Sequence, residues 1–313
     1  MFNKKLTKIL NIEYPIIQGG MTWIAESNLA AAVSNAGGLG IIAAGGAPGD
    51  WLREQIQKTR TLTNKPFGVN IMLLSPFAEE VAQVVVEEKV PVVITGAGSP
   101  EKYMAMWKAR NITVIPVVPS VLLGSRMEKL GADAVVAEGM EAGGHIGELT
   151  TMALMPQVVD ALNIPVIAAG GIGDGRGVAA VAMLGAAGVQ VGTRFLAADE
   201  CIVSDAYKEK VIKARDTDTM ITGRSTGHPV RGLKNKFARN FVKLEKDETM
   251  TLEDIEKLGA GSLRAAVEGD VVNGALMAGQ VAGMVRKTEP AKDIVESLYN
   301  EAKEIIKKIS ETL

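Results

Sequence analysis

The segments VIAAGGIGDG at residues 166–175 and AAGVQVGTRF at 186–195 carry the strongest structural signal in this chain. Each is an apolar, β-branched run that stops at glycine, the first at Gly170 and Gly171 and the second at Gly192. Glycine lets backbone N–H groups come close to a ligand, so two consecutive strand ends of this kind predict a phosphate-binding backbone. In a barrel of eight βα units, such a site often follows the last two strands.

Eight apolar segments with strand character alternate with segments of helical spacing, such as 26–37, 76–89, 120–131 and 150–163. The strand segments begin near Tyr14, Leu39, Phe67, Pro91, Thr113, Ala132, Pro165 and Gly188. They are almost continuously hydrophobic, which is typical of parallel strands buried on both faces. An open doubly wound sheet is the alternative, but eight units that end before residue 200 favour a (β/α)8 TIM barrel.

The alternation ends after Arg194. We expect a barrel over residues 1–215, a small lid or substrate region over 216–260, and C-terminal helices over 261–313 that pack back on the barrel. Helical spacing is expected at 251–258, 274–286 and 289–311; the last places Ile294, Leu298 and Ile305 on one face of an amphipathic helix.

Bulk composition excludes several classes of protein. The chain has 34 basic and 36 acidic residues, so it has no electrostatic footprint for nucleic acid. Cys201 is the single cysteine, which excludes an internal disulfide and favours a reducing compartment. The uncharged segment 27–49 contains six glycines and Pro48, which argues against a membrane span. We expect a cytoplasmic protein without a membrane partner.

The expected strand ends are polar and rich in glycine, and βα loops build the active site of this fold. No metal-ligand spacing and no Ser/His/Asp set falls on these loops, which suits a bound cofactor that carries the chemistry. The candidate residues are Gly20, Met21 and Thr22 after the first strand, Asn70, Thr95, Glu138, His145 in EAGGHIG, and then Gly170, Gly171, Gly192 and Thr193.

Several motifs together resemble one family along nearly the whole chain. They are QGGM at 18–21, GVNIMLLSPF at 68–77, TGAGSPEKYM at 95–104, AEGMEAGGHIG at 137–147, PVIAAGGIGDG at 165–175, QVGTRF at 190–195 and MAGQVAG at 277–283. The chain resembles the FMN-dependent enoyl-acyl-carrier-protein reductase II family (FabK type), in the nitronate monooxygenase or 2-nitropropane dioxygenase superfamily. EAGGH and GTRF are shared with the monooxygenases, whereas GVNIMLLSPF and TTMALMPQ are closer to the reductases.

The resemblance implies that FMN lies across the mouth of the barrel. Its phosphate would be held by the last two strand ends, and Glu138 would either contact the ribityl chain or pair with a neighbouring backbone N–H. The residues expected to bind FMN are Gly20, Met21, Thr22, Asn70, Thr95, Glu138, Gly143, Gly144, Gly170, Gly171, Gly192, Thr193, Met277, Gly279 and Gln280, the last three from a C-terminal helix.

The implied reaction is the NADH- or NADPH-driven reduction of a trans-2-enoyl thioester on acyl carrier protein, in fatty-acid elongation. His145 is the expected catalytic residue, as proton donor or as stabiliser of the thioester oxygen, because histidine titrates near neutral pH. The alternative role for His145 is to position the flavin or the loop.

The nearest rival function is a nitronate monooxygenase, and a further one is a non-redox barrel that binds a phosphorylated ligand. The resemblance also implies a homodimer and a monovalent cation near residues 222–229.

The segment RGLKNKFARNFVK at 231–243 contains five basic residues and no acidic one. We expect it to steer an acidic carrier protein through long-range attraction, together with a substrate-facing role for His228. The alternatives for the basic segment are an ordinary solvated face or a site for a nicotinamide phosphate. The residues of this predicted docking set are His228, Arg231, Lys234, Lys236 and Arg239.

Overall fold

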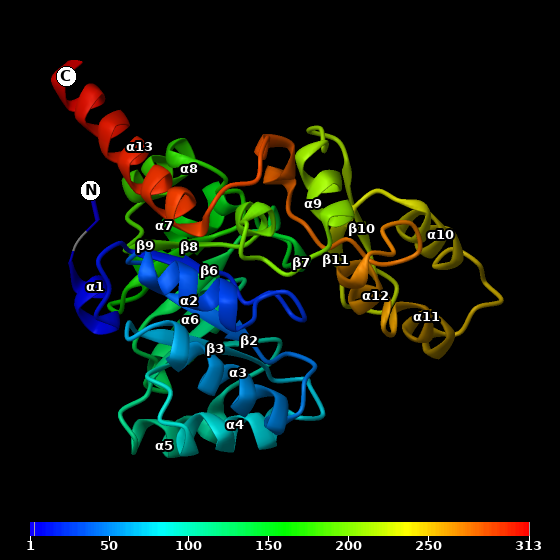
Figure 1. Ribbon diagram of the computed structural model, residues 1–313, viewed down its shortest axis with the longest axis horizontal. Coiled ribbons are helices and arrows are strands. Elements are labelled where there is room, and N and C mark those ends of the chain that lie inside the picture. Colours follow the sequence, from blue (N-terminus) through cyan, green and yellow to red (C-terminus); the bar gives the residue numbers. More distant parts are fainter. Residues whose placement is uncertain (3, 313) are drawn as a thin grey trace.

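The structure is a computed structural model that describes residues 1–2 and 4–312 (Figure 1). In this part of the chain, eight parallel strands run in the order β1-β9-β8-β6-β5-β4-β3-β2, and a bridge between Ile17 and Leu39 joins the two ends. The predicted (β/α)8 barrel is confirmed, and each of the eight expected segments supplies a strand. The barrel strands are β1 (Ile16–Gln18), β2 (Gly40–Ala43), β3 (Phe67–Met72), β4 (Val92–Gly96), β5 (Thr113–Val118), β6 (Val135–Glu138), β8 (Val166–Ala169) and β9 (Gly188–Val191).

Gln18 helps to close the barrel where β1 meets β2. Its side chain is fully buried, and its Oε1 accepts a hydrogen bond of 3.0 Å from the backbone N–H of Ile41. The backbone N–H of Gln18 donates to Leu39 at 3.0 Å, and that of Leu39 donates to Ile16 at 2.9 Å. A side chain therefore supplies one of the bonds that a longer ladder would provide.

Helices cover the outside of the barrel, as the sequence spacing predicts. They are α2 (Ser27–Asn35), α3 (Gly49–Leu62), α4 (Ala78–Glu87), α5 (Glu101–Lys108), α6 (Val121–Lys129), α7 (Thr151–Ala161) and α8 (Gly175–Met183). A short α1 (Lys5–Leu10), which the sequence analysis does not predict, adds Leu6 and Leu10 to the buried residues inside the barrel. The two side chains are 0% and 2% exposed, so α1 caps one end of the core.

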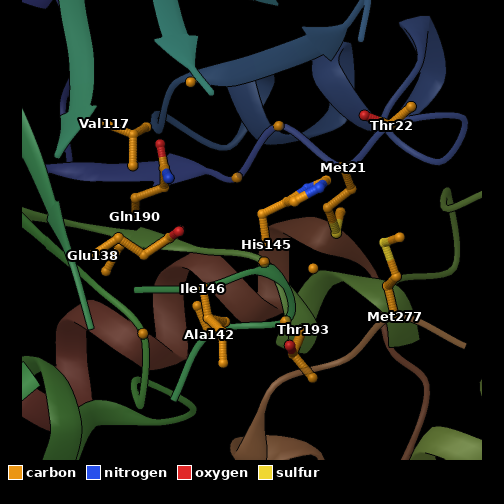
Figure 2. Close-up of a pocket in the computed structure, with 18 of the residues that line it drawn as sticks. Met21, Thr22, Val117, Glu138, Ala142, His145, Ile146, Gln190, Thr193 and Met277 are labelled. Atoms are coloured by element: carbon orange, nitrogen blue, oxygen red, sulfur yellow. The ribbon is translucent and has the colours of Figure 1, made fainter. Parts of the chain in front are cut away.

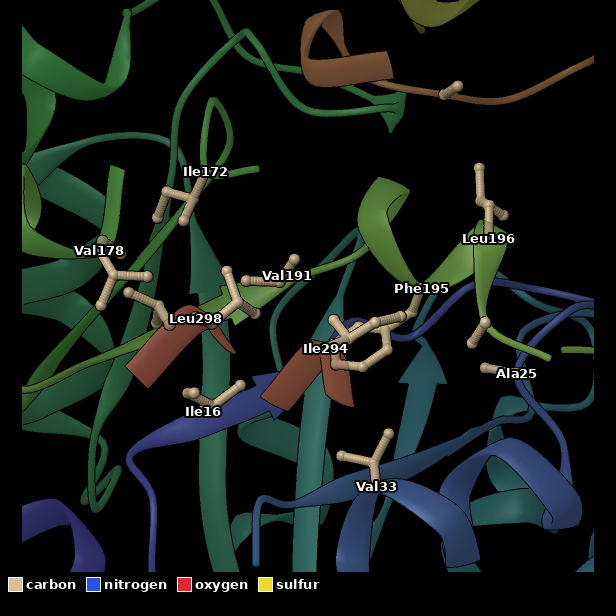
Figure 3. Close-up of a cluster of buried hydrophobic side chains, with 14 of the residues drawn as sticks. Ile16, Ala25, Val33, Ile172, Val178, Val191, Phe195, Leu196, Ile294 and Leu298 are labelled. Atoms are coloured by element: carbon tan, nitrogen blue, oxygen red, sulfur yellow. The ribbon is translucent and has the colours of Figure 1, made fainter. Parts of the chain in front are cut away.

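The C-terminal helix α13 (Ala291–Thr312) packs on the barrel against α8 and α2. Figure 3 shows Ile294 and Leu298 of this helix beside Ile16 and Phe195, all of them buried. Removing such apolar side chains from water stabilises the fold by about 1.5–3 kcal/mol each. The expected helix at 289–311 is therefore present, with its apolar face on the barrel.

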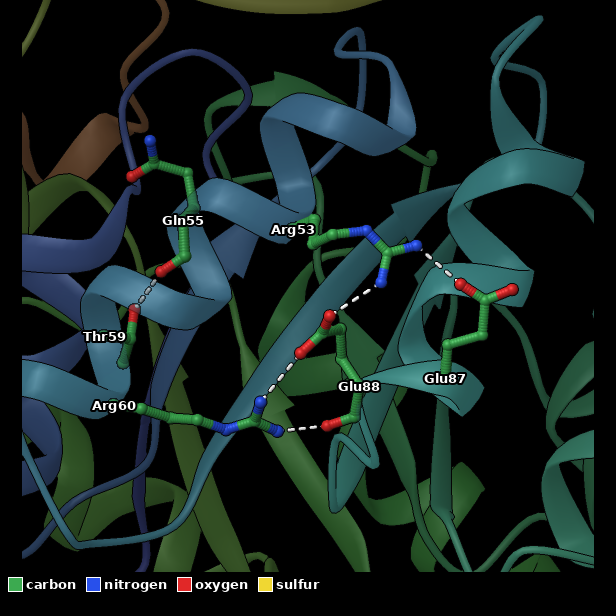
Figure 4. Close-up of polar contacts among 6 residues, drawn as sticks. All are labelled: Arg53, Gln55, Thr59, Arg60, Glu87 and Glu88. Carbon is green, nitrogen blue, oxygen red and sulfur yellow. Dashed lines mark hydrogen bonds and ion pairs between the residues drawn. The ribbon is translucent and has the colours of Figure 1, made fainter.

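Ion pairs tie α3 to α4 on the outer surface (Figure 4). Arg53 contacts Glu88 at 2.7 Å and Glu87 at 2.5 Å, and Arg60 contacts Glu88 at 2.8 Å. Both arginines are partly exposed, so each pair contributes at most about 1 kcal/mol. These pairs hold neighbouring helices in register and lie outside the site.

The chain leaves the barrel after β9 through η1 (Thr193–Ala197) and α9 (Asp205–Ile212). Strands β10 (Thr219–Thr222) and β11 (Val230–Leu233) then form a small antiparallel sheet with β7 (Gly144–His145), which belongs to the loop after β6. Three helices follow: α10 (Lys236–Leu244), α11 (Leu252–Gly259) and α12 (Ser262–Glu268). We call residues 219–268 the lid; in Figure 1 it projects to one side of the barrel.

The prediction of a helix at 274–286 is wrong. Only the 3-10 turn η2 (Gln280–Met284) forms there, and Met277 instead makes a β-bridge with Gly232. Glycines at 274, 279 and 283 weaken the helix, and extended pairing with β11 competes successfully. In the described part of the chain, no helix is long and apolar enough to cross a membrane.

Candidate active site

A cavity of about 540 Å³ lies at the carboxyl ends of the barrel strands, where the lid meets the barrel. Most of the predicted cofactor residues line it (Figure 2): Gly20, Met21, Thr22, Asn70, Glu138, Gly143, Gly144, Gly170, Gly171, Gly192, Thr193 and Met277. His145 and His228 line it as well. Segments from the whole length of the chain therefore meet at one cavity, although their individual roles stay predictions.

The turns after β8 and β9 present free backbone donors to the cavity. Gly170 and Gly171 have φ of 86° and 73°, a region that favours glycine. Among the described residues, no hydrogen bond uses the backbone N–H groups of Gly170, Gly171, Gly192 or Thr193. The nearby start of α8 differs, because Asp174 accepts from its first N–H groups. The available anion site is therefore the pair of glycine turns.

Glu138 and Gln190 face the same cavity from one layer of the barrel. The register pairs Glu138 with Ala169 and Ala169 with Gln190, so the two polar side chains are separated by one strand. Glu138 has no hydrogen-bond or ion-pair partner among the described residues, and burial raises the pKa of its carboxyl group to about 7. The Oε1 of Gln190 is buried and, within the described structure, unpartnered. Buried polar groups are normally bonded, so these two are suited to a polar ligand.

The loop between β6 and α7 is held in place by Glu141. Its carboxylate accepts from the backbone N–H of Thr151 at 3.0 Å, at the start of α7, and its backbone carbonyl accepts from Gln280 at 2.9 Å. On the other side, the loop forms β7, in which His145 pairs with Val230 of β11. Glu141 thus joins the barrel to the first residue of η2.

His145 projects into the cavity from β7. Figure 2 shows its ring directed toward Met21, with Met277 nearby. Desolvation, and next the charge of His228, lowers the pKa of His145 from its ordinary value of 6.5. The imidazole is therefore mainly neutral at pH 7, with one N–H donor and one acceptor nitrogen.

Three of the predicted cofactor residues do not line the cavity. The backbone N–H of Gly279 donates to Oγ1 of Thr193 at 2.8 Å, and that of Gln280 donates to Glu141. The backbone of Gly279 therefore helps to position Thr193, and that of Gln280 helps to position Glu141. Thr95 lies within β4, 1% exposed, with a buried hydroxyl that has no partner among the described groups.

The predicted docking set is only partly exposed. Arg231 is 4% exposed, and its Nε donates to the carbonyl of Met140 at 3.1 Å. Including Arg231 in a docking surface is therefore wrong: it alternates inward on β11 and holds the loop after β6. Lys234, Lys236 and Arg239 are exposed, and Nζ of Lys234 donates to the carbonyl of Thr217.

Glu141, Gln190 and Leu263 also line the cavity, although they are not among the residues predicted from the sequence. Gln190 had a readable signal, because it is the single polar residue in the apolar strand GVQV. Leu263 had none, since it reaches the site from α12. No group of three or more His, Cys, Asp or Glu side chains in the described chain could hold a metal ion. The cation near 222–229 stays a prediction.

Comparison with known proteins agrees with this geometry. A barrel with free backbone donors after its last two strands is the architecture of phosphate-binding TIM-barrel proteins. Residues 3–301 match the model of the nitronate monooxygenase family, and the chain belongs to that family.

Individual relatives have different printed activities. A solved structure of FabK from Thermotoga maritima is 49% identical, with a TM-score of 0.97 and full coverage of both chains. A probable nitronate monooxygenase of Staphylococcus saprophyticus is 36% identical over 96% of this chain and 98% of its own. A (3aS,4S,5R,7aS)-5-hydroxy-7a-methyl-1-oxo-octahydro-1H-indene-4-carboxyl-CoA dehydrogenase of Rhodococcus jostii is 33% identical over 95% of both chains.

Proposed function

We propose that the protein is an FMN-dependent enoyl-acyl-carrier-protein reductase that uses NADH or NADPH in fatty-acid elongation, as a cytoplasmic homodimer. The observation that carries this proposal is the full-length likeness to FabK, at 49% identity and a TM-score of 0.97. The motifs GVNIMLLSPF and TTMALMPQ, which resemble the reductase branch, point the same way. A relative of 33% identity is named for a CoA thioester, which supports a thioester substrate for this chain.

The residues around the cavity fit FMN. The free N–H groups at the glycine turns after β8 and β9 would hold its phosphate, whose charge needs several donors. Glu138 and the unpartnered Oε1 of Gln190 would bond the polar atoms of the ribityl chain or ring. Met21 and Met277 would supply adaptable apolar surface beside the ring.

FMN, when bound, supplies hydride-transfer chemistry that no side chain of this chain could supply. The chain's own contribution is to bind the thioester, exclude water and manage charge. As hydride reaches the β-carbon of the enoyl group, negative charge develops on the thioester oxygen. The N–H of His145 would stabilise that oxygen, and the protonated imidazole would deliver a proton to the α-carbon.

Nitronate monooxygenase activity is the second candidate. The family model and the staphylococcal relatives carry that name, and they match nearly the whole chain. In that reaction, the neutral form of His145 would act as a base. The lowered pKa of His145 is compatible with a base, so the side chain alone does not separate the two functions.

Steady-state kinetics test the proposal. Purified FMN-loaded protein is assayed with crotonyl thioester and NADH or NADPH, and in parallel with propyl nitronate and oxygen. We expect rapid consumption of one nicotinamide that depends on the enoyl thioester. Oxygen uptake that depends on nitronate, with no enoyl-dependent turnover, would overturn the reductase and support the monooxygenase.

A further inference from the structure

The lid contains a second cavity that the proposed reaction does not use. It has a volume of about 350 Å³ and lies where α10 meets α11 and α12. Phe237 and Phe241 of α10 form one wall, with ring centroids 5.7 Å apart, and Leu258 and Ala265 contribute from the neighbouring helices. Asn240 stands at the rim and is exposed. This second cavity is thus an apolar recess that opens beside the surface of α10.

A row of exposed positive charges runs along α10 next to this recess. Lys236, Arg239 and Lys243 recur at spacings of three and four, so they lie on one face of the helix. All three are exposed, and none makes an ion pair or hydrogen bond with another described residue. We call these three residues the α10 stripe. Phe237 and Phe241, one and five positions after Lys236, lie on the adjoining face that lines the recess.

In the neighbouring helices α11 and α12, a basic residue forms an ion pair with an acidic residue of the same helix. Lys257 contacts Glu253 at 2.8 Å on α11, and Arg264 contacts Glu268 at 3.0 Å on α12. The α10 stripe lacks such partners, and Glu245 is the single acidic residue from 231 to 246. Glu245 itself accepts from the hydroxyl of Ser225 at 3.0 Å. The charge of Lys236 contributes to lowering the pKa of Asp270, and that of Lys243 contributes to lowering the pKa of Asp247, although neither pair forms an ion pair. The stripe is therefore partly compensated, and it still presents three exposed cations, none of them in an ion pair within the described chain, to an incoming molecule.

Strand β11 connects the α10 stripe to the active-site cavity. Val230, at the start of β11, pairs with His145, and α10 begins six residues later at Lys236. At about 3.3 Å per residue, this segment spans at most roughly 20 Å. An extended pantetheine arm has a similar length, so a carrier bound at the stripe could deliver a thioester to His145.

We propose that the α10 stripe and the recess beside it form the docking surface for the carrier of the thioester substrate, an acidic protein. This inference rests on the proposed reductase function. Carboxylates of the carrier would face Lys236, Arg239 and Lys243, and one apolar side chain would enter the recess between Phe237 and Leu258. Aromatic pockets of this kind are the usual energetic centres of interfaces, whereas exposed charges mainly set the rate of encounter.

A second copy of this chain fits the surface less well. Twofold symmetry places the same patch on both partners, so a dimer through the stripe would bring like charges together. The net charge of the whole chain is only −2, so it has no strong complementary excess to offer. The charge pattern therefore favours an acidic partner.

The charge test compares two double variants of equal charge change. Lys236→Glu with Arg239→Glu reverses the stripe, and acidic residues early in a helix are compatible with its dipole. Lys303→Glu with Lys308→Glu is the matched control on α13, which lies on the other side of the molecule (Figure 1). KM is measured for crotonyl-acyl-carrier protein and for S-crotonyl-N-acetylcysteamine, which has neither a carrier nor a phosphate.

We expect the stripe variant to raise KM for the carrier substrate on the order of tenfold, with an effect that shrinks as salt rises. KM for the small thioester and for the nicotinamide should be the same as in the control variant. An equal loss with carrier and small thioester, or a loss confined to the nicotinamide, would overturn docking at the stripe. A wild-type protein that turns over neither thioester would instead refute the proposed function.

The recess is tested separately at Asn240. Asn240→Trp fills the recess from its exposed rim, whereas Asn240→Ala leaves it open. We expect the Trp variant to raise KM for the carrier substrate at high salt as well as low salt, and the Ala variant to resemble wild type. A Trp variant with unchanged carrier KM would show that no side chain of the carrier enters the recess. A dimer that dissociates in the Trp variant would assign the surface to a second copy.

Discussion

His145 and Glu138 face one cavity, and burial shifts their pKa values in opposite directions. The pKa of His145 is lowered and that of Glu138 is raised to about 7, because a desolvated site disfavours the charged form of either group. The Glu138 carboxyl group therefore changes protonation state near neutral pH, whereas His145 favours its neutral form more strongly than a free histidine does. Groups of this kind concentrate at functional sites, which supports placing the chemistry here.

Replacing His145 with alanine tests its role as acid. We expect the variant to keep its FMN and to lose enoyl turnover by about 100-fold or more, the usual contribution of a general acid. In the wild type, turnover should rise as the pH falls through the lowered pKa of His145, because the protonated fraction grows. The pH dependence should vanish in His145→Ala. A rate that instead falls with decreasing pH would indicate a base, as nitronate oxidation requires.

We expect the substitution Glu138→Gln to stabilise the flavin-free protein by an amount that depends on pH. The folded pKa is about 7 and the ordinary value is 4.5, so between these values the folded protein binds more protons than the unfolded chain. The free energy of unfolding therefore decreases as pH rises through this window. We expect the variant to have a Tm a few degrees above wild type at pH 8. The two Tm values should converge near pH 4.5, and a constant difference across this range would contradict the account.

The loop between β6 and α7 connects the barrel, the lid sheet and the segment before η2. Glu141 fixes its start, β7 joins β11, and Gly143 packs against the backbone of Ala278 and Gly279. Because these contacts involve backbone atoms, they leave little room for adjustment. The position of His145 thus depends on contacts with distant parts of the chain, including the pairing of His145 with Val230 and the packing of Gly143 against Ala278.

Gly143→Ala should disturb this arrangement. A Cβ at Gly143 would lie 2.6 Å from backbone atoms of Ala278 and Gly279, so the loop or the facing segment must move. We expect lower thermal stability and weaker FMN retention, measured by Tm and by flavin absorbance after gel filtration. Gly96→Ala is the control, since a Cβ there meets nothing within 4 Å although Gly96 also lines the cavity. Equal behaviour of the two variants would contradict the proposed packing role.

At the scale of the whole molecule, the sequence predicts the barrel well and the lid poorly. The strands are long apolar runs, such as TVIPVV at 113–118, whose hydrophobicity is local information. The glycine turns after β8 and β9 are also local, so the phosphate end of the site could be found. The lid depends on pairing between β11, β7 and Met277, which lie far apart in sequence. For the same reason, the burial of Arg231 and the lining residue Leu263 could not be read from the chain.

A cofactor that binds at the mouth of the barrel should stabilise the fold. Adding FMN to flavin-free protein at 100 times its Kd should stabilise the fold by about 2.7 kcal/mol. For a chain of this size, that corresponds to a rise in Tm of several degrees in a thermal scan. Riboflavin, which lacks the phosphate, should produce a clearly smaller shift in Tm at the same concentration as FMN. Equal shifts would contradict phosphate binding at the glycine turns.

The central claim is that electrons pass from a nicotinamide to an enoyl thioester in this cavity. The most direct test is anaerobic: NADH or NADPH is added to the FMN-loaded protein, the flavin absorbance is followed, and crotonyl thioester is then added. The account predicts bleaching by one nicotinamide and recovery of the absorbance when the thioester arrives. A flavin that stays oxidised with both nicotinamides, but is bleached by a nitronate, would contradict it.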